Sequence, residues 1–173
     1  MSETHTPEPF ALGRRSKKNL QQVHPDLVAV VERGLALSAV DFAVTEGVRE
    51  IKRQRRLVKT GDSATLNSRH LPRVPTNNPE LGEVSHAVDL AAWVDGTVSY
   101  DWPYYYQIAA AIKQAAAELN VAIRWGGGWA LLDTFDTPEA ARQAYIERKN
   151  RQGKKVYSDG PHFELCWEAY PCL

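Results

Sequence analysis

Short stretches in which apolar and polar residues alternate predict four strands, because successive side chains of a strand point to opposite faces. They cover residues 40–45, 85–91, 121–125 and 162–165. An Asp-Gly pair within residues 94–98 predicts a hairpin turn soon after the second strand.

The same alternation assigns side chains to faces in two of these strands. In residues 85–91, Asp89 is expected to share a face with Ala87 and Ala91, and His86 to point the other way. In residues 162–165, His162 and Glu164 are expected on one face and the two apolar residues on the other.

Apolar residues three or four positions apart predict helices between the strands. The pattern becomes helical from Ser16, and a strong run begins at His24-Pro25-Asp26, where His24 is expected to cap or pack. Further helices are predicted over residues 50–59, 104–119 and 138–150, the second of them capped by Asp101-Trp102-Pro103.

Three consecutive glycines, Gly126 to Gly128, follow the third predicted strand. They indicate either an unusual backbone path or close approach of another group to the backbone. They lack the spacing and the following helix of a dinucleotide-binding loop, so a phosphate-binding loop is excluded.

Long stretches without periodicity are predicted as loops. Residues 1–12 form a polar lead-in, residues 60–69 are rich in turn formers, and residues 71–84 carry three prolines. The 173 residues suffice for one domain with a real core, and we expect a single domain over residues 1–173.

Charge and composition narrow the function classes. With 21 basic and 21 acidic residues, the chain has no global field that would draw it to nucleic acid or anionic lipid. No stretch approaches the roughly 18 apolar residues that span a bilayer. The N-terminus also lacks a secretory signal pattern, so we expect synthesis in the cytoplasm and no stable membrane insertion.

The two cysteines, Cys166 and Cys172, form no CxxC unit and have no matching pair, which excludes a four-sulfur zinc site. Free thiols are favoured over a late disulfide.

The histidines offer a metal site. A catalytic zinc takes three nitrogen or oxygen ligands and keeps a fourth position for water. His70, Asp89 and His162 can supply these ligands. His86, on the opposite strand face from Asp89, could join them only if the strand bends.

A general base is available next to this set. Asp159 precedes His162 by three residues across a Gly-Pro turn and would take this role. Glu164, on the same strand face as His162, is the rival base.

Several segments together carry a resemblance to a known family. They are Ser68–Leu71, Ser85–Leu90 and Asp159–Leu165, with further matches at 45–49, 53–54, 101–103 and 124–127. The chain resembles the phage endolysin L-alanyl-D-glutamate endopeptidases, relatives of the VanY/VanX-type D-alanyl-D-alanine peptidases, over roughly residues 14–129 and 157–171.

The resemblance implies a fold and a set of roles. The fold is α+β, with a small antiparallel sheet that carries one zinc ion and helices packed around it (Hedgehog/DD-peptidase-like). The zinc ligands would be His70, Asp89 and His162, and the catalytic base Asp159. Arg49 and Ser68 would bind the substrate and its developing oxyanion. For Arg49, an ordinary salt bridge with Glu46 or Glu50 is the alternative.

The chain departs from the family pattern at several positions. Residues 72–84 are inserted between the first two ligands, and residues 130–156 separate the glycines from the base. Ser85 and Gly128 stand where the family usually has glycine and an acid. The ligands can still converge if residues 72–84 loop out, because closure entropy grows slowly with loop length.

The implied function is a zinc peptidase that cuts between L-alanine and D-glutamate in the peptidoglycan stem peptide and so lyses bacteria. It would act as a monomer on the cell wall, after release through a membrane lesion. A D-alanyl-D-alanine carboxypeptidase or dipeptidase is the enzymatic alternative, and a zinc-containing cell-wall-binding module without activity is the other.

Overall fold

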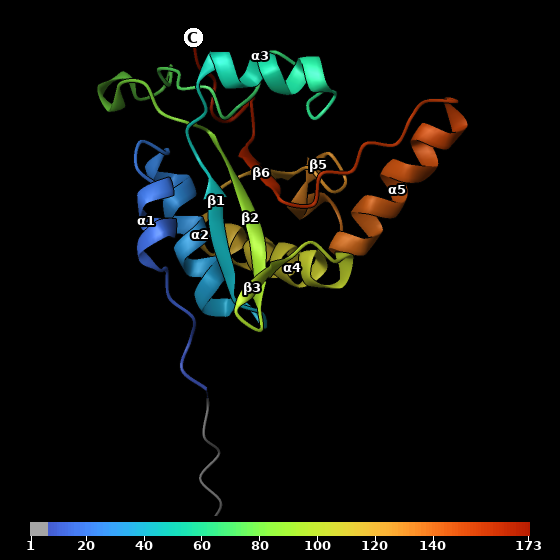
Figure 1. Cartoon of the computed structure of the whole chain (residues 1–173), viewed down its shortest axis with the longest axis horizontal. Helices are drawn as coiled ribbons and strands as arrows, with labels where there is room; N and C mark the ends of the chain where they lie inside the picture. The colour runs from blue at the N-terminus through green and yellow to red at the C-terminus, as the bar shows by residue number, and fades with distance from the viewer. Residues whose placement is uncertain (1–6) are drawn as a thin grey trace, which may run out of the picture.

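Short strands, all paired antiparallel, form one sheet through the middle of the computed structural model, which describes residues 7–173 (Figure 1). The strands are β1 (Phe42–Glu46), β2 (Ala87–Val94), β3 (Thr97–Ser99), β4 (Ile123–Trp125), β5 (Ala130–Leu131) and β6 (His162–Leu165). Their order is β1-β2-β6-β4-β5, and β3 pairs with the end of β2 as the expected hairpin. The last strand in the chain therefore lies in the interior of the sheet.

Helices surround this sheet. They are α1 (Arg14–Asn19), α2 (Pro25–Leu37), α3 (Ile51–Thr60), α4 (Trp102–Leu119) and α5 (Pro138–Arg151), with short 3₁₀ turns η1 (Pro79–Leu81) and η2 (Leu132–Thr134). The predicted helices are present with ends shifted by a residue or two, and the expected α+β class is confirmed. Residues 1–6 of the predicted lead-in, with His5, lie outside the described residues.

The residues expected to cap α2 and α4 stand at the N-cap positions of these helices. His24 stands at the N-cap of α2, and its Nδ1 accepts a hydrogen bond of 3.1 Å from the backbone N–H of Asp26. Asp101 stands at the N-cap of α4, as expected, and its side chain makes no capping hydrogen bond. Pro103 in the first turn of α4 still favours a helix start there, because its missing N–H has no helical partner to lose.

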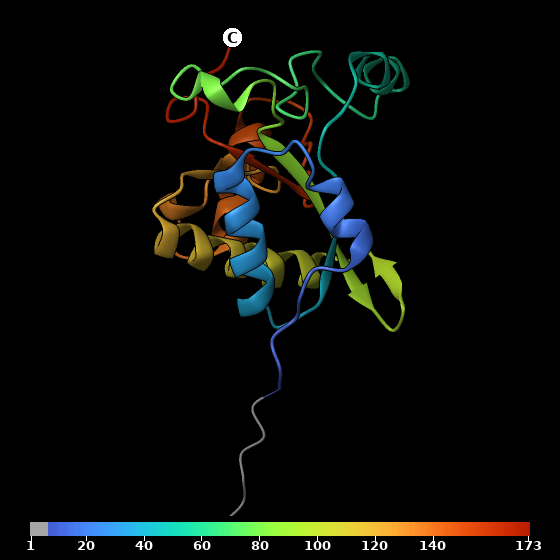
Figure 2. The same ribbon diagram turned by 90° about the vertical axis from the view of Figure 1, so that its left-hand side faces the viewer.

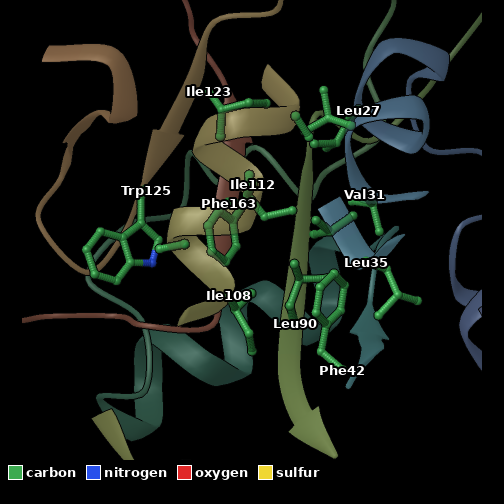
Figure 3. Packing of buried hydrophobic residues seen from close by; sticks show 14 of the residues in the cluster. Leu27, Val31, Leu35, Phe42, Leu90, Ile108, Ile112, Ile123, Trp125 and Phe163 are labelled. Atoms are coloured by element: carbon green, nitrogen blue, oxygen red, sulfur yellow. The ribbon is translucent and has the colours of Figure 1, made fainter. Parts of the chain in front are cut away.

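The hydrophobic core lies between one face of the sheet and helices α2 and α4 (Figure 3). Alternate residues of β1, β2, β4 and β6 enter it, namely Phe42, Val44, Val88, Leu90, Ala92, Ile123, Trp125, Phe163 and Leu165. Figure 2 shows α2 crossing in front of α4. The two helices pack closely at Gly34, where an added Cβ would lie 2.5 Å from Cδ1 of Ile112.

The other face of the sheet carries the polar partners of these same strands. Because Val88, Leu90, Phe163 and Leu165 point into the core, the alternating positions Asp89, His162 and Glu164 point away from it. Asp89 lies directly opposite His162 in the β2–β6 register, and Arg124 lies opposite Glu164 in the β4–β6 register. The face assignments predicted from the sequence are thus confirmed.

Residues 72–84 leave the body of the molecule and return. Arg73 and Val84 exchange two backbone hydrogen bonds of 3.0 Å, which close the base of the excursion. Its outer part lies beside the C-terminal tail, where the backbone N–H of Thr76 donates to the carbonyl of Pro171 (Figure 2). The segment loops out as expected, and both flanking ligands stay near the sheet.

Among residues 7–173, no helix combines the length and the apolarity that a bilayer crossing requires.

The α2–α4 contact should dominate the stability of the fold. Replacing Ile112, which is 1% exposed, by alanine would leave a cavity at this crossing and should lower the free energy of unfolding by about 3 kcal/mol. The matched control is Ile51→Ala, at a side chain 45% exposed, which should cost well under half as much. Urea unfolding of both variants measures the difference, and equal losses would contradict this account of the core.

Candidate metal centre

Three side chains from distant parts of the chain converge on the polar face of the sheet. His70 follows the 60–69 loop, Asp89 lies in β2 and His162 begins β6. The distances are 3.1 Å between His70 Nε2 and Asp89 Oδ1, 3.2 Å between His70 Nε2 and His162 Nδ1, and 3.4 Å between His162 Nδ1 and Asp89 Oδ1. The sequence predicted this set of three residues.

These spacings fit a bound metal ion. Ligand atoms that surround a tetrahedral zinc at about 2.0–2.1 Å lie about 3.3 Å from one another. The three measured separations, 3.1 to 3.4 Å, match that value. Within the described part of the chain, this is the group of histidine and acidic side chains able to hold a metal.

The outward nitrogen of each histidine has its own partner. His70 Nδ1 lies 2.7 Å from the carbonyl oxygen of Gly47, which can only accept, so this nitrogen carries the proton. His162 Nε2 lies 2.7 Å from Oε2 of Glu164. Both inward nitrogens are then left with a lone pair, which is the form that binds a metal.

The electrostatics of the group also favour a positive charge at its centre. Burial alone would lower the pKa of His162, but its hydrogen bonds to Asp89 and Glu164 outweigh burial and raise the pKa to about 10. Burial would raise the pKa of Asp89, yet His70 and His162 hold it well below its usual range. A proton on His162 or a metal ion between the ligands would each compensate the negative charge of Asp89 and Glu164.

Arg49 supports the centre from the side of Asp89. Its guanidinium donates to both carboxylate oxygens of Glu46 at 2.8 and 2.7 Å, to Gln54 at 2.8 Å and to Asp89 Oδ2 at 3.3 Å. The salt bridge with Glu46 was the alternative interpretation of Arg49, and it is present together with a contact to a candidate ligand. Four of the five N–H donors of the guanidinium are engaged, which leaves one for a substrate.

Ser68 is buried at the edge of the same group. Its Oγ accepts a hydrogen bond of 3.2 Å from the backbone N–H of His70, so it fixes the chain at the first ligand. Ser85, buried where the family usually has glycine, donates from Oγ to the carbonyl of Ala87 at 2.9 Å and accepts from the N–H of Ala87. Both serines hold backbone next to the ligands.

Asp159 lies near enough to interact electrostatically with His162, Asp89 and His70, and its carboxylate accepts no hydrogen bond from any described residue. Burial raises its pKa, an effect that the nearby histidines oppose in part. Its backbone N–H donates to the carbonyl of Gly126 at 2.9 Å, and Gly126 in turn donates to the carbonyl of His162. A half-buried carboxylate with a free oxygen and a raised pKa suits a proton acceptor.

The three glycines allow close approach. None of them has a positive φ, so a special backbone path is not their reason. A Cβ on Gly126 would lie 2.6 Å from the carbonyl oxygen of Asp159 and 2.9 Å from Cβ of His162. Gly127 packs against the ring of Trp125, and Gly128 against the backbone at Ala141. Of the two expectations for these glycines, close approach is the one observed.

Glu164, the rival base, has no free carboxylate oxygen. Its two oxygens are occupied by His162 Nε2 at 2.7 Å and by the guanidinium of Arg124 at 3.1 Å. Burial raises its pKa, but these two partners outweigh burial and lower the pKa overall. This geometry is that of a carboxylate that orients a metal-binding histidine.

His86 stands apart from the cluster. Its ring is 1% exposed, its centroid lies 5.5 Å from that of His24, and its Nε2 has no partner among the described residues. Burial, helped by Arg69 and His24, lowers its pKa to about 4. The strand does not bend to bring it to the other three.

Arg69, next to His70, ties the C-terminal tail to the site. Its guanidinium donates to the carbonyls of Leu165, Cys166 and Tyr170, and it lies 4.1 Å from the ring centroid of Trp167. Cys166 and Cys172 are free thiols in the structure, as expected.

A cleft of about 900 Å³ opens over the cluster. His70, Asp89, His162 and Asp159 line its floor together with Ser68. The lining also includes residues of α3 and the 60–69 loop, residues at the end of α5, and Lys155 and Tyr157. The volume lies in the range of ligand-binding sites, so the cluster is open to a substrate.

Comparison with known proteins agrees with this geometry. The family model of the phage L-alanyl-D-glutamate peptidases matches residues 9–166. The chain belongs to this family. The resemblance seen in its motifs is therefore confirmed.

Two relatives of this peptidase can be compared in detail. The L-alanyl-D-glutamate peptidase of Escherichia phage T5 is 27% identical over 121 residues, which cover 69% of this chain and 82% of that protein. The crystal structure of the Serratia marcescens L-Ala D-Glu endopeptidase ChiX has 38% sequence identity and a TM-score of 0.69, and the match covers 95% of this chain and 96% of the other.

Some supporting residues of this peptidase escaped prediction. The backbone carbonyl of Gly47 could not be singled out from the sequence, because every residue has a backbone carbonyl. Glu164 was considered only as a base, although the His-x-Glu alternation that put it on the face of His162 also suits a partner of the ring. The anchoring role of Arg69 depends on a tail 96 or more residues away.

The Glu164–His162 hydrogen bond should strengthen metal binding. In Glu164→Gln, the ring loses a charged partner, and zinc affinity should fall by about tenfold. Competition with a chromogenic chelator measures it. Glu168→Gln, at an exposed position outside the cleft, is the matched control and should bind zinc like the unchanged protein. Unchanged affinity in Glu164→Gln would contradict the assigned support.

His86 should make the metal-free protein acid-sensitive. The folded state keeps His86 neutral to about pH 4, whereas the unfolded chain takes up the proton near pH 6.5. Stability is then fully present above pH 6.5 and falls by up to about 3 kcal/mol on going down to pH 4. In His86→Asn this fall should be smaller, measured by urea unfolding with chelator present. An equal fall in the free energy of unfolding with pH in the two proteins would refute this role of His86.

Proposed function

We propose that this peptidase is zinc-dependent and hydrolyses the L-alanyl-D-glutamate bond of the peptidoglycan stem peptide. The observation that carries the proposal is the convergence of His70, Asp89 and His162 at metal-ligand spacing on the floor of an open cleft. Family membership supports the bond, because both relatives are named for it.

His70 Nε2, Asp89 Oδ1 and His162 Nδ1 would hold one zinc ion. When bound, zinc supplies Lewis acidity, which polarises a carbonyl and brings the pKa of a water molecule toward about 7. Three protein ligands would leave a fourth position for water or substrate. The hydrogen bonds that the two rings donate, from His70 to the carbonyl of Gly47 and from His162 to the carboxylate of Glu164, keep both rings in the orientation and tautomer that this binding needs.

Asp159 would act as the proton carrier. Its carboxylate takes a proton from the attacking water as the new C–O bond forms at the alanine carbonyl. The same proton then passes to the nitrogen of D-glutamate as the C–N bond breaks. Burial raises the pKa of the Asp159 carboxyl toward the range in which this group can both accept and release a proton.

Arg49 and Ser68 would assist on the substrate side. The one N–H of Arg49 that has no protein partner can donate to the oxyanion, a contribution commonly worth a few kcal/mol. The hydroxyl of Ser68 lines the cleft and can donate to the peptide. We further propose that the protein works as a monomer on the cell wall after synthesis in the cytoplasm.

Digestion of purified peptidoglycan tests the function. We expect new L-alanine carboxyl ends and new D-glutamate amino ends, loss of activity with chelator and recovery with zinc. Free D-alanine instead would indicate the D-alanyl-D-alanine peptidase activity. A zinc-loaded protein that releases neither product would be a wall-binding module.

Asp159→Asn isolates the role of the base. It should retain zinc at one equivalent and lose at least about 100-fold in kcat, because proton transfer is removed and the shape is kept. Asp136→Asn, at an exposed position outside the cleft, is the matched control and should be fully active. Full activity of Asp159→Asn would sink this assignment.

A further inference from the structure

The segment from Arg148 to Lys155 concentrates positive charge in a chain that is neutral overall. Its eight residues include five cations and no acid: Arg148, Lys149, Arg151, Lys154 and Lys155. It comprises the end of α5 and the turn that follows. A local excess of positive charge therefore exists here.

Part of this segment belongs to the wall of the cleft over the metal centre. Arg148, Lys149 and Lys155 line the cleft, whereas Arg151 and Lys154 do not. Helix α5 projects from the body, and of its residues only Pro138, Ala141 and Tyr145 are buried (Figure 1). The helix contributes little to the core, and its end is available for another role.

Tyr145 fixes the cationic end of α5 in place. Its hydroxyl accepts from the backbone N–H of Tyr157 at 3.0 Å and donates to the carbonyl of Tyr157 at 3.3 Å. The cationic groups of Arg148 and Lys149 lie 5.5 and 5.7 Å from the centroid of its ring. Tyr157 in turn donates from its hydroxyl to the carbonyl of Asp62, another residue of the lining. The cations are thus held at a defined edge of the cleft.

The other cations of the cleft are already paired. Glu46 binds Arg49 and Arg53, and Glu164 binds Arg124. Arg69 donates to backbone carbonyls of the tail. By contrast, within residues 7–173 no carboxylate oxygen lies within 4.0 Å of the charged groups of Arg148, Lys149 or Lys155.

A structural explanation accounts for only part of this arrangement. Cations are favourable at a helix C-terminus because of the helix dipole, which suits Arg148, Lys149 and Arg151. Lys155 lies beyond the helix, after the turn at Gly153, and receives no such benefit. The dipole also does not select the face that looks into the cleft.

We propose that Arg148, Lys149 and Lys155 bind a free carboxylate of the substrate peptide and thereby select anionic stem peptides. This rests on the proposed function, since it names the substrate feature that the same cleft recognises. A glutamate joined to the rest of a peptide through one side keeps a second carboxyl group free. Guanidinium and ammonium groups bind carboxylates through charge-assisted hydrogen bonds. A cleft of about 900 Å³ has room for more than the two residues of the scissile bond.

The test compares two synthetic stem peptides that share the L-alanyl-D-glutamyl bond. One carries free carboxylates beyond that bond, and in the other they are primary amides. The test variant is Arg148→Gln/Lys155→Gln. The matched control, Arg151→Gln/Lys154→Gln, removes one arginine and one lysine from the same segment outside the cleft.

The test variant should lose about tenfold in kcat/KM on the carboxylate peptide, through KM, and change little on the amide peptide. The control should match the unchanged enzyme on both. Equal losses on the two peptides, or an equal loss in the control, would overturn the proposal. So would a salt-dependent loss on whole cell walls alone, which would indicate an anionic wall polymer as the ligand.

Calorimetric titration separates this proposal from the proposed function. If the unchanged protein cleaves neither peptide, the function fails, and binding alone decides the inference. Tighter binding of the carboxylate peptide, with the preference lost in Arg148→Gln/Lys155→Gln and kept in the control, would still support it. Equal binding of both peptides by the unchanged protein would reject it.

Discussion

The register between β2 and β6 is the constraint on which the site depends. It places Asp89 directly opposite His162 and Ala87 opposite Glu164. A shift of one residue would turn His162 and Glu164 into the core and bring Phe163 and Leu165 to the cleft. The apolar residues that fill the core therefore also fix the metal ligands, since each strand has only two faces. Packing and chemistry are specified by the same alternation.

Around this register, the surrounding groups restrict what the ligands can do. Gly47 and Glu164 hold the two rings, Arg49 holds the far oxygen of Asp89, and the glycines after β4 let the backbone of Asp159 approach. Each contact restricts the motion of a ligand side chain in advance, so that less conformational entropy is lost when an ion binds. The centre is prepared for a cation before any ion arrives.

Much of this could be predicted from the sequence, for identifiable reasons. Strict alternation predicted the faces of Asp89 and His162, and the helical spacing of apolar residues predicted α2 and α4. The short β5 and the 3₁₀ turns were not predicted, because two or three residues carry no period. The close approach at Gly126 and the tail contacts of Arg69 depend on residues far away in the chain, which local patterns do not report. The roles of Asp159, Arg49 and Ser68 stay predictions.

The interior position of β6 has a consequence for how the protein matures. His162 lies 92 residues after His70, and one edge of β2 has no long partner until β6 is added between β2 and β4. A partly synthesised chain that ends before β6 thus lacks a ligand and exposes a strand edge at the same time. An ion held by His70, Asp89 and His162 would join the first half of the chain to its last strand, as a cross-link does. Peptide hydrolysis would then be possible only for a chain that has folded as far as β6.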